Sequence, residues 1–213
     1  MAILIACERS QRVCTAFRRV GIEAYSCDVV ETEGDFPEWH ITEDARILLG
    51  RPWDAVIAFP PCTHLASSGA RHFAAKRVDG RQQAAADFFL SFTRLSCPWA
   101  IENPVGVMSS LFRKPDQIIQ PWQYAKTEDE LYSKSTCLWL NRLPPLVSIR
   151  GTPPTETYHT WTDVQGRQKR QTAWYYSTRC LPAAQRGAAA SITPQGVADA
   201  MAEQWTRFFT QNS

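Results

Sequence analysis

The sequence has few of the features that mark membrane, secreted or metal-binding proteins. It contains no run of about 18 apolar residues, so we expect no membrane span. Its N-terminus lacks the basic start and longer apolar stretch of a secretion signal. No two of the seven cysteines have CxxC spacing and the four histidines are scattered, so we expect neither a metal site nor a disulfide framework. Reduced thiols are typical of the cytoplasm, where we expect this protein to reside.

The net charge is small, but the charged residues are unevenly distributed along the sequence. The net charge of +2 is too small to indicate a nucleic-acid partner by itself. Between residues 150 and 186, however, six basic residues face two acids, and six Tyr, His and Trp residues lie among them. Such a mixture suits a phosphate backbone and stackable bases. It equally suits a polar surface excursion with buried aromatics, and the sequence leaves both interpretations open.

The chain alternates strand-like and helix-like segments. Its 213 residues suit one domain, or one domain with a small appendage. We predict strands over residues 2–7, 23–30, 53–59, 99–101 and 137–140, and helices over 11–20, 41–49, 82–95 and 193–209, with Thr42 capping the second helix. Residues 151–170 have no convincing period and suggest a long loop or small insert. The alternation predicts an α/β, Rossmann-like fold with a mostly parallel sheet flanked by helices.

Chemically active residues follow several of these strands. Cys7 and Glu8 follow the first, Asp28 the second, Cys62 the third, and Glu102 with Asn103 the fourth. In an open α/β sheet, ligands bind outside the carboxyl ends of the strands. We therefore expect these side chains to meet at one edge of the sheet.

Cys62 stands out because it follows two prolines at a strand end. A thiol on a loop that two prolines stiffen is expected to be accessible to a ligand rather than packed in the core. Attack requires thiolate, which a nearby helix N-terminus or cation would favour, and His64 and Arg71 are close in sequence. The alternative is a buried structural cysteine, which we favour for Cys7, Cys14, Cys27 and Cys97 but not for Cys62.

Glu102 also ends a buried strand, where a carboxylate is costly unless it is paired or functional. Taken alone, Glu102-Asn103 would be a surface acid beside a helix-capping amide. Next to the Pro-Pro-Cys loop we instead favour a functional carboxyl for Glu102, with Asn103 bracing the loop.

Pro60-Pro61-Cys62 followed about forty residues later by Glu102-Asn103 resembles the cytosine-5 DNA methyltransferase family, most closely its short phage- and prophage-type members. The resemblance covers most of residues 1–147 and 190–206. It implies that Cys62 is the nucleophile on cytosine, that Glu102 contacts the ring nitrogen and that Lys134 is the remaining cation of the motif that braces the flipped base.

The resemblance also implies a site for S-adenosylmethionine. Asp28 matches the acid that holds the ribose, and Asp44 the acid near the adenine. The other residues that we expect at the cofactor are Cys7, Glu8 and Ser10 of the first loop, Phe59 and Pro60 on the cofactor side, and Gly196 of the helix that closes the pocket.

The chain departs from this family in its first loop and in its length. Residues 7–12 contain no glycine, although the family's loop is rich in it, and only about forty residues replace its target-recognition domain. We therefore expect a catalytic domain from 1–148 and 190–213, and in 149–189 a basic, aromatic insert that serves as a reduced target-recognition region. DNA is the expected partner. The alternatives are another pyrimidine substrate, such as a nucleotide or single-stranded nucleic acid, and an inactive, methyltransferase-like DNA-binding protein.

Overall fold

The computed structural model describes residues 1–211, apart from the side chains of residues 183, 184 and 188. Its main sheet contains β1 (Ala2–Ala6), β2 (Glu23–Asp28), β3 (His40–Thr42), β4 (Ala55–Ala58), β5 (Trp99–Pro104), β6 (Gln117–Ile119) and β7 (Thr136–Asn141). A separate hairpin contains β8 (Tyr158–Thr162) and β9 (Gln168–Thr172). The helices are α1 (Arg12–Arg19), α2 (Ala45–Leu48), α3 (Phe73–Val78), α4 (Arg81–Ser91), α5 (Met108–Leu111), α6 (Ala173–Cys180), α7 (Ala183–Ser191) and α8 (Gln195–Gln211).

The main sheet is mostly parallel. Its strand order is β3-β2-β1-β4-β5-β7-β6, and the pairs from β3 to β5 are all parallel. Strand β7 runs antiparallel to both of its neighbours, β5 and β6. The order reverses at β1, because β2 lies on one side of it and β4 on the other. This topology confirms the predicted α/β, Rossmann-like fold.

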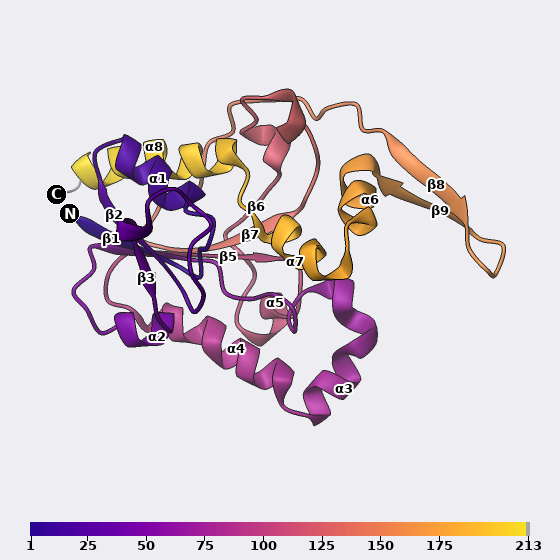
Figure 1. The fold of residues 1–213 in the computed structure, drawn as a ribbon, viewed down its shortest axis with the longest axis horizontal. Helices are drawn as coiled ribbons and strands as arrows, with labels where there is room; N and C mark the ends of the chain where they lie inside the picture. Colours follow the sequence, from indigo (N-terminus) through magenta and orange to yellow (C-terminus); the bar gives the residue numbers. More distant parts are fainter. Residues whose placement is uncertain (212–213) are drawn as a thin grey trace.

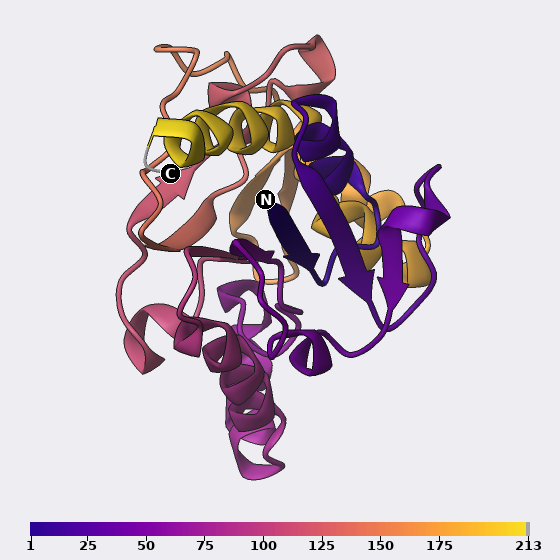
Figure 2. The ribbon, with the colours of Figure 1, turned by 90° about the vertical axis from the view of Figure 1, so that its left-hand side faces the viewer.

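Helices cover both faces of the sheet (Figures 1 and 2). Successive side chains of a strand point to opposite faces. Accordingly, Ile3 and Ile5 of β1 pack with α1 and α8, whereas Leu4 and Ala6 pack with α2 and α4. A strand buried on both faces needs apolar side chains throughout, which explains the continuous apolar run at the N-terminus.

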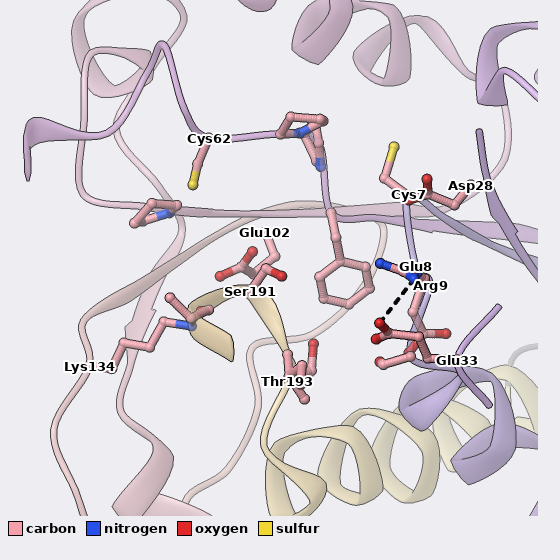
Figure 3. Close-up of a pocket in the computed structure, with 17 residues that line it drawn as sticks. Cys7, Glu8, Arg9, Asp28, Glu33, Cys62, Glu102, Lys134, Ser191 and Thr193 are labelled. Carbon is pink, nitrogen blue, oxygen red and sulfur yellow. Dashed lines mark hydrogen bonds and ion pairs between the residues drawn. The ribbon is translucent and has the colours of Figure 1, made fainter. Parts of the chain in front are cut away.

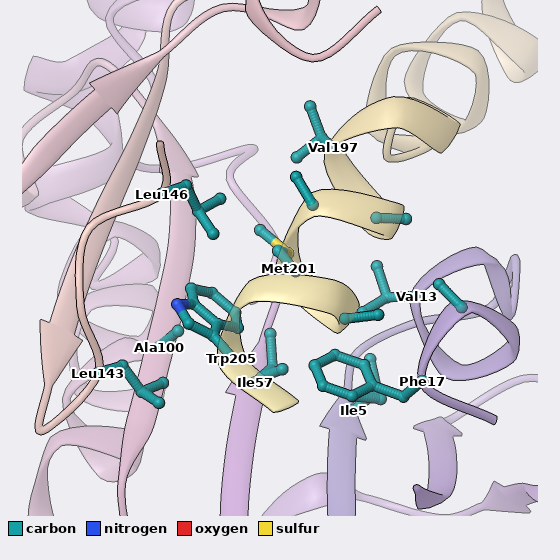
Figure 4. Packing of buried hydrophobic residues seen from close by; sticks show 14 of the residues in the cluster. Ile5, Val13, Phe17, Ile57, Ala100, Leu143, Leu146, Val197, Met201 and Trp205 are labelled. Atoms are coloured by element: carbon teal, nitrogen blue, oxygen red, sulfur yellow. The ribbon is translucent and has the colours of Figure 1, made fainter. Parts of the chain in front are cut away.

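The terminal helix α8 locks one face of the core (Figure 4). The fully buried Trp205 inserts its ring beside the sheet and donates its indole N–H to the carbonyl of Pro144, at 2.9 Å. Met201 and Val197 continue the same stripe towards the start of the helix. Full burial of a large apolar side chain contributes about 1.5–3 kcal/mol, so α8 is an integral part of the core on this face of the sheet.

Two local predictions were wrong. Thr42 does not cap a helix, because residues 40–42 form β3 and Asp44 caps α2 by accepting from the Arg46 amide. Strand β5 does not end at residue 101 but runs on through Pro104, since β7 pairs with it along its whole length. Of the two forms expected for residues 151–170, the small insert fits the structure, because residues 158–162 and 168–170 are paired in the separate β8-β9 hairpin.

The segment from 149 to 189 carries the β8-β9 hairpin, α6 and most of α7. The hairpin projects away from the sheet (Figure 1). Of the expected catalytic span 190–213, residues 212 and 213 lie outside the described residues. In residues 1–211, none of the helices is both long and apolar enough to cross a membrane. The same part of the chain holds no group of three His, Cys, Asp or Glu side chains that could bind a metal ion, and all seven cysteines are free thiols.

Candidate active site

A pocket opens at the carboxyl edge of the parallel strands (Figure 3). Its volume of about 260 Å³ approaches the lower end of the range for small-molecule sites, roughly 300–1,000 Å³. The strand ends supply Cys7, Glu8, Asp28, Phe59, Pro60, Cys62 and Glu102, and later segments supply Lys134 and residues 190–193. The pocket thus gathers most of the side chains that were expected to meet there, although they are spread over more than 100 residues of sequence.

The loop that carries Cys62 is held from two sides. The buried Asn103 donates its side-chain amide to the carbonyl of Pro60, at 2.7 Å. The amides of Leu65 and Ala66 both donate to the Cys62 carbonyl at 2.9 Å. Rotation of the loop would break these bonds and leave buried polar groups unpaired. The thiol therefore has a fixed position relative to β5.

A close backbone approach ties this loop to the segment after β5. The Val107 amide donates to the Leu65 carbonyl, and the Ser67 amide donates to the Val105 carbonyl, both at 2.9 Å. Gly106 lies between these bonds, and a Cβ at that position would stand 2.1 Å from the Leu65 oxygen. Only glycine permits the two segments to pack this closely.

Cys62, Glu102 and Lys134 gather on one side of the pocket (Figure 3). Burial raises the pKa of the Glu102 carboxyl, while the Lys134 ammonium lowers it in part. The Lys134 ammonium is also held by the Ala190 carbonyl, at 2.6 Å. A carboxyl in such a site favours its protonated form, which can donate a proton to a ligand.

The pKa of Cys62 is also raised, by burial first and by the Glu102 carboxylate second. Lys134 and Lys76 lower it. These two lysines, and not the sequence neighbours His64 and Arg71, supply the cationic surroundings of the thiol. The Glu102 carboxylate thus opposes ionisation of the Cys62 thiol, and the two lysines favour it.

The first loop forms the opposite side of the pocket without any glycine. Cys7 and Gln11 have φ angles of 59° and 56°, in the left-handed region that glycine usually occupies. Each costs roughly 1–2 kcal/mol for an L-residue. Gln11 offsets this cost by bonding to Ser26 and, in both directions, to the backbone of Phe36. The turns that glycine would provide are thus made by hydrogen bonding.

Glu8 is buried beneath this loop and caps α1. Its carboxylate accepts from the amides of Val13 at 2.6 Å and Cys14 at 3.1 Å. Burial raises the pKa of Glu8 to about 7, against the lowering effect of those two amides. An acid at a helix N-terminus is favourable, but this one takes up amides that a bound anion would otherwise use.

Asp28, Arg9 and Glu33 complete this end of the pocket. Asp28 is the last residue of β2 and raises the pKa of the neighbouring Cys7 thiol, after burial. Arg9 forms an ion pair with Glu33 at 3.1 Å and donates its Nε to the Glu31 carbonyl. The pair links the first loop to the segment that follows β2 (Figure 3).

Three of the expected site residues do not line the pocket. Asn103 lies behind it and acts on the Cys62 loop. Asp44 is bound to Arg46, which lowers the pKa of its carboxyl, although its charge still reaches Cys7. Gly196 packs against the Tyr124 carbonyl, and its amide donates to Glu130. Its role in this structure is the close packing of α8.

The sequence interpretation missed Arg9, Glu33 and Lys76. Arg9 and Glu33 line the pocket, and the ammonium of Lys76 donates to the Thr63 carbonyl at 2.6 Å beside Cys62. No motif surrounds Glu33 or Lys76, and their positions follow from the chain's path after β2 and from the orientation of α3. Arg9, in contrast, lies next to Glu8 in a loop already expected at the pocket.

None of the aromatic side chains of the hairpin region is buried: four are exposed, and Trp161 and Trp174 are half-buried. His159 stacks on Tyr176 with ring centroids 3.6 Å apart, and Arg179 lies over Trp161. Arg170 lies over the ring of Tyr158 in the same way, with 47% of that tyrosine exposed. Of the two interpretations that the sequence left open, buried aromatics therefore do not apply here.

No family model matches the chain, and no curated protein matches it. Among solved structures, it is similar to a candidate DNA modification methyltransferase encoded within an E. coli prophage, with 14% identity and a TM-score of 0.45. The similarity covers 84% of this chain and 63% of that one, so the chain spans less than two thirds of that protein. The strand order defines the class as Rossmann-like α/β, and its activity has to be inferred from its own residues.

Proposed function

We propose that the protein transfers a methyl group from S-adenosylmethionine to carbon 5 of cytosine in DNA, through a covalent bond from Cys62. The observation that carries this proposal is the grouping of Cys62, Glu102 and Lys134 on one side of the pocket at the strand ends. A rigidly held thiol next to a carboxyl of raised pKa is suited to attack on a ring that must be protonated as it is attacked.

The residues present suit the cofactor. S-adenosylmethionine carries ribose hydroxyls, an aromatic base and cationic groups, and this end of the pocket offers the Asp28, Glu8 and Glu33 carboxylates with the Phe59 ring. Asp28 would hold the ribose, and Phe59 with Pro60 would line the adenine and methyl path. When bound, the cofactor supplies the methyl group to carbon 5.

The protein's own residues would act in sequence. The target cytosine leaves the duplex stack at a cost of a few kcal/mol. The Cys62 thiolate adds to carbon 6 while the Glu102 carboxyl gives its proton to ring nitrogen 3, so carbon 5 becomes nucleophilic. After carbon 5 gains the methyl group, a base removes its proton, nitrogen 3 returns its proton to Glu102 and the thiolate leaves. Lys134 limits the build-up of negative charge beside Glu102.

We also propose residues 1–148 and 190–213 as the catalytic domain, and residues 149–189 as a reduced target-recognition region. The exposed aromatics of the hairpin lie among cations, with Arg170 and Arg179 each against a ring. Such pairs suit the phosphates and bases of nucleic acid. Because this region is small, a short target sequence or an unpaired cytosine is the substrate to be tested first.

The test is product analysis after incubation with S-adenosylmethionine. Duplex DNA, single-stranded DNA and free deoxycytidine monophosphate are each treated, digested to nucleosides and examined by mass spectrometry. The proposal requires 5-methyldeoxycytidine from a DNA substrate with the wild type and none with Cys62→Ala. Methylation at an exocyclic amine would retain the methyltransferase but reject Cys62 as nucleophile. Methylation of the free nucleotide alone would replace DNA by a nucleotide as substrate.

A further inference from the structure

The anion-binding end of helix α1 is already occupied in this protein. In α/β folds of this type, free amides at the first helix commonly bind an anionic group of the ligand. Here the Glu8 carboxylate accepts from the amides of Val13 and Cys14, and the Thr15 amide donates to the Gln11 carbonyl. A ligand carboxylate that approached α1 would meet the Glu8 carboxylate rather than free donors.

The basic side chain of Arg9 lies at the same end of the pocket. Among the described lining residues, Arg9 and Lys134 are the two with basic side chains. Lys134 lies with Glu102 on the side of Cys62, whereas Arg9 lies with Glu33 on the other (Figure 3). An anionic group that reaches the first loop therefore has Arg9 as its charged partner.

The Arg9–Glu33 ion pair is suited to exchange. The two side chains are 47% and 46% exposed and meet at 3.1 Å. Ion pairs this exposed contribute roughly 0–1 kcal/mol, so opening one costs little. A guanidinium presents a fork of donors that matches a carboxylate, and the released Glu33 would be free to accept from an ammonium. Together the two side chains complement a zwitterion.

We propose that Arg9 binds the carboxylate, and Glu33 the ammonium, of the amino-acid end of the cofactor, and that their own ion pair opens to admit it. The proposal rests on the proposed function, because it assumes S-adenosylmethionine as the cofactor. The Arg9–Glu33 pair is exchanged for two pairs with the ligand, and net charge is conserved. Arg9 thus takes the place of the α1 amides, which already donate to Glu8, as the partner of the ligand carboxylate. Specificity for an amino-acid end then comes from the side chains of Arg9 and Glu33.

Calorimetric titration with two probes tests this assignment. S-adenosylhomocysteine has the amino-acid end, and 5′-methylthioadenosine lacks it. For Arg9→Gln we expect S-adenosylhomocysteine to bind at least ~10-fold more weakly, as befits loss of a charge-assisted bidentate contact. Binding of 5′-methylthioadenosine should change less than twofold. Arg81→Gln is the matched control, because Arg81 forms an exposed ion pair with Asp79 away from the pocket lining.

The outcomes separate the two proposals. If Arg9→Gln leaves the ratio of the two affinities unchanged, or weakens both probes equally, the role of Arg9 is overturned while the cofactor assignment stands. If the folded wild type binds neither probe at millimolar concentration, the cofactor assignment fails and the role of Arg9 fails with it. A fall in affinity for S-adenosylhomocysteine alone, absent in Arg81→Gln, supports the assignment.

Discussion

Replacing Gly106 by alanine probes how exactly Cys62 has to be held. A Cβ at this position would lie 2.1 Å from the Leu65 oxygen and 2.9 Å from the Leu65 carbonyl carbon, whereas real Cβ atoms essentially never come closer than 3.0 Å. Both atoms belong to backbone, so neither can swing away. The segment after β5 and the Cys62 loop must therefore separate by about 1 Å to restore contact distance.

Separation on that scale affects both stability and rate. It lengthens the two 2.9 Å bonds between Val107 and Leu65 and between Ser67 and Val105. At about 0.5–1.5 kcal/mol each, their loss lowers the free energy of unfolding by about 1–3 kcal/mol. A misplacement of about 1 Å at the reacting group can lower the rate ~100-fold. We expect kcat/KM for DNA methylation to fall by about that factor in Gly106→Ala.

The assay combines urea unfolding with initial rates measured well below the unfolding temperature. Gly50→Ala is the control, because no atom lies within 4 Å of a Cβ built at Gly50, and we expect it to alter stability by less than about 0.5 kcal/mol. If Gly106→Ala methylates at the wild-type rate, the close approach does not position Cys62 and the reasoning is refuted. Loss of activity in proportion to the unfolded fraction alone would refute it as well.

Three further perturbations follow from the charges of the site. The pKa of Glu8 is about 7 in the folded protein against an ordinary 4.5, so the stabilising effect of the protonated Glu8 is complete below pH 4.5 and is lost as pH rises through 7. In urea unfolding, Glu8→Gln should remove about 3 kcal/mol of that dependence of the unfolding free energy on pH. An unchanged dependence on pH would contradict the burial argument. The mechanism needs a protonated Glu102 and an ionised Cys62, and these two requirements predict a bell-shaped pH profile of kcat/KM. Glu102→Gln should lower kcat/KM ~100-fold or more and leave a rate that only rises with pH, whereas a rate that still falls at high pH would assign the alkaline limb to another group. Arg170→Ala and Arg179→Ala should each weaken DNA binding and reduce its salt dependence by about one counterion, and a salt slope equal to wild type would place DNA elsewhere.

Much of the fold follows from local patterns in the sequence. The apolar runs at β1 and β4 predicted buried parallel strands, and the spacing of Val197, Met201 and Trp205 predicted the face of α8 that packs on the sheet. These features depend on the periodicity of apolar side chains, which can be read from the amino-acid sequence alone. The place where the strand order reverses depends on pairing between distant segments, and only the structure gives it.

The candidate site was predictable where residues follow strands, and less so elsewhere. Cys62, Glu102 and Asp28 were expected at one edge because parallel strands end together. Lys76 and Glu33 could not be found in this way, since helix α3 places Lys76 and the segment after β2 places Glu33. Gly196 was expected at the cofactor because of the family resemblance, and in the structure it packs against the Tyr124 carbonyl.

The first loop makes tight turns without glycine. The sequence showed only that residues 7–12 lack the glycines of the family that the chain resembles. Cys7 and Gln11 nevertheless adopt left-handed conformations, and the bonds from Gln11 to Ser26 and Phe36 stabilise them. Such long-range compensation leaves no local signal in the sequence.

The central claim is that Cys62 forms a covalent bond with cytosine, and mass spectrometry of a trapped complex tests it most directly. Oligonucleotides of mixed sequence in which 5-fluorodeoxycytidine replaces deoxycytidine are incubated with the protein and S-adenosylmethionine. Because fluorine cannot leave carbon 5 as a proton does, the thiol cannot be released after methyl transfer. We predict a complex that survives denaturation, maps to the peptide containing Cys62 and is absent in Cys62→Ala. Methylation of ordinary cytosine at carbon 5 without any such adduct, or an adduct that persists in Cys62→Ala, would contradict the account.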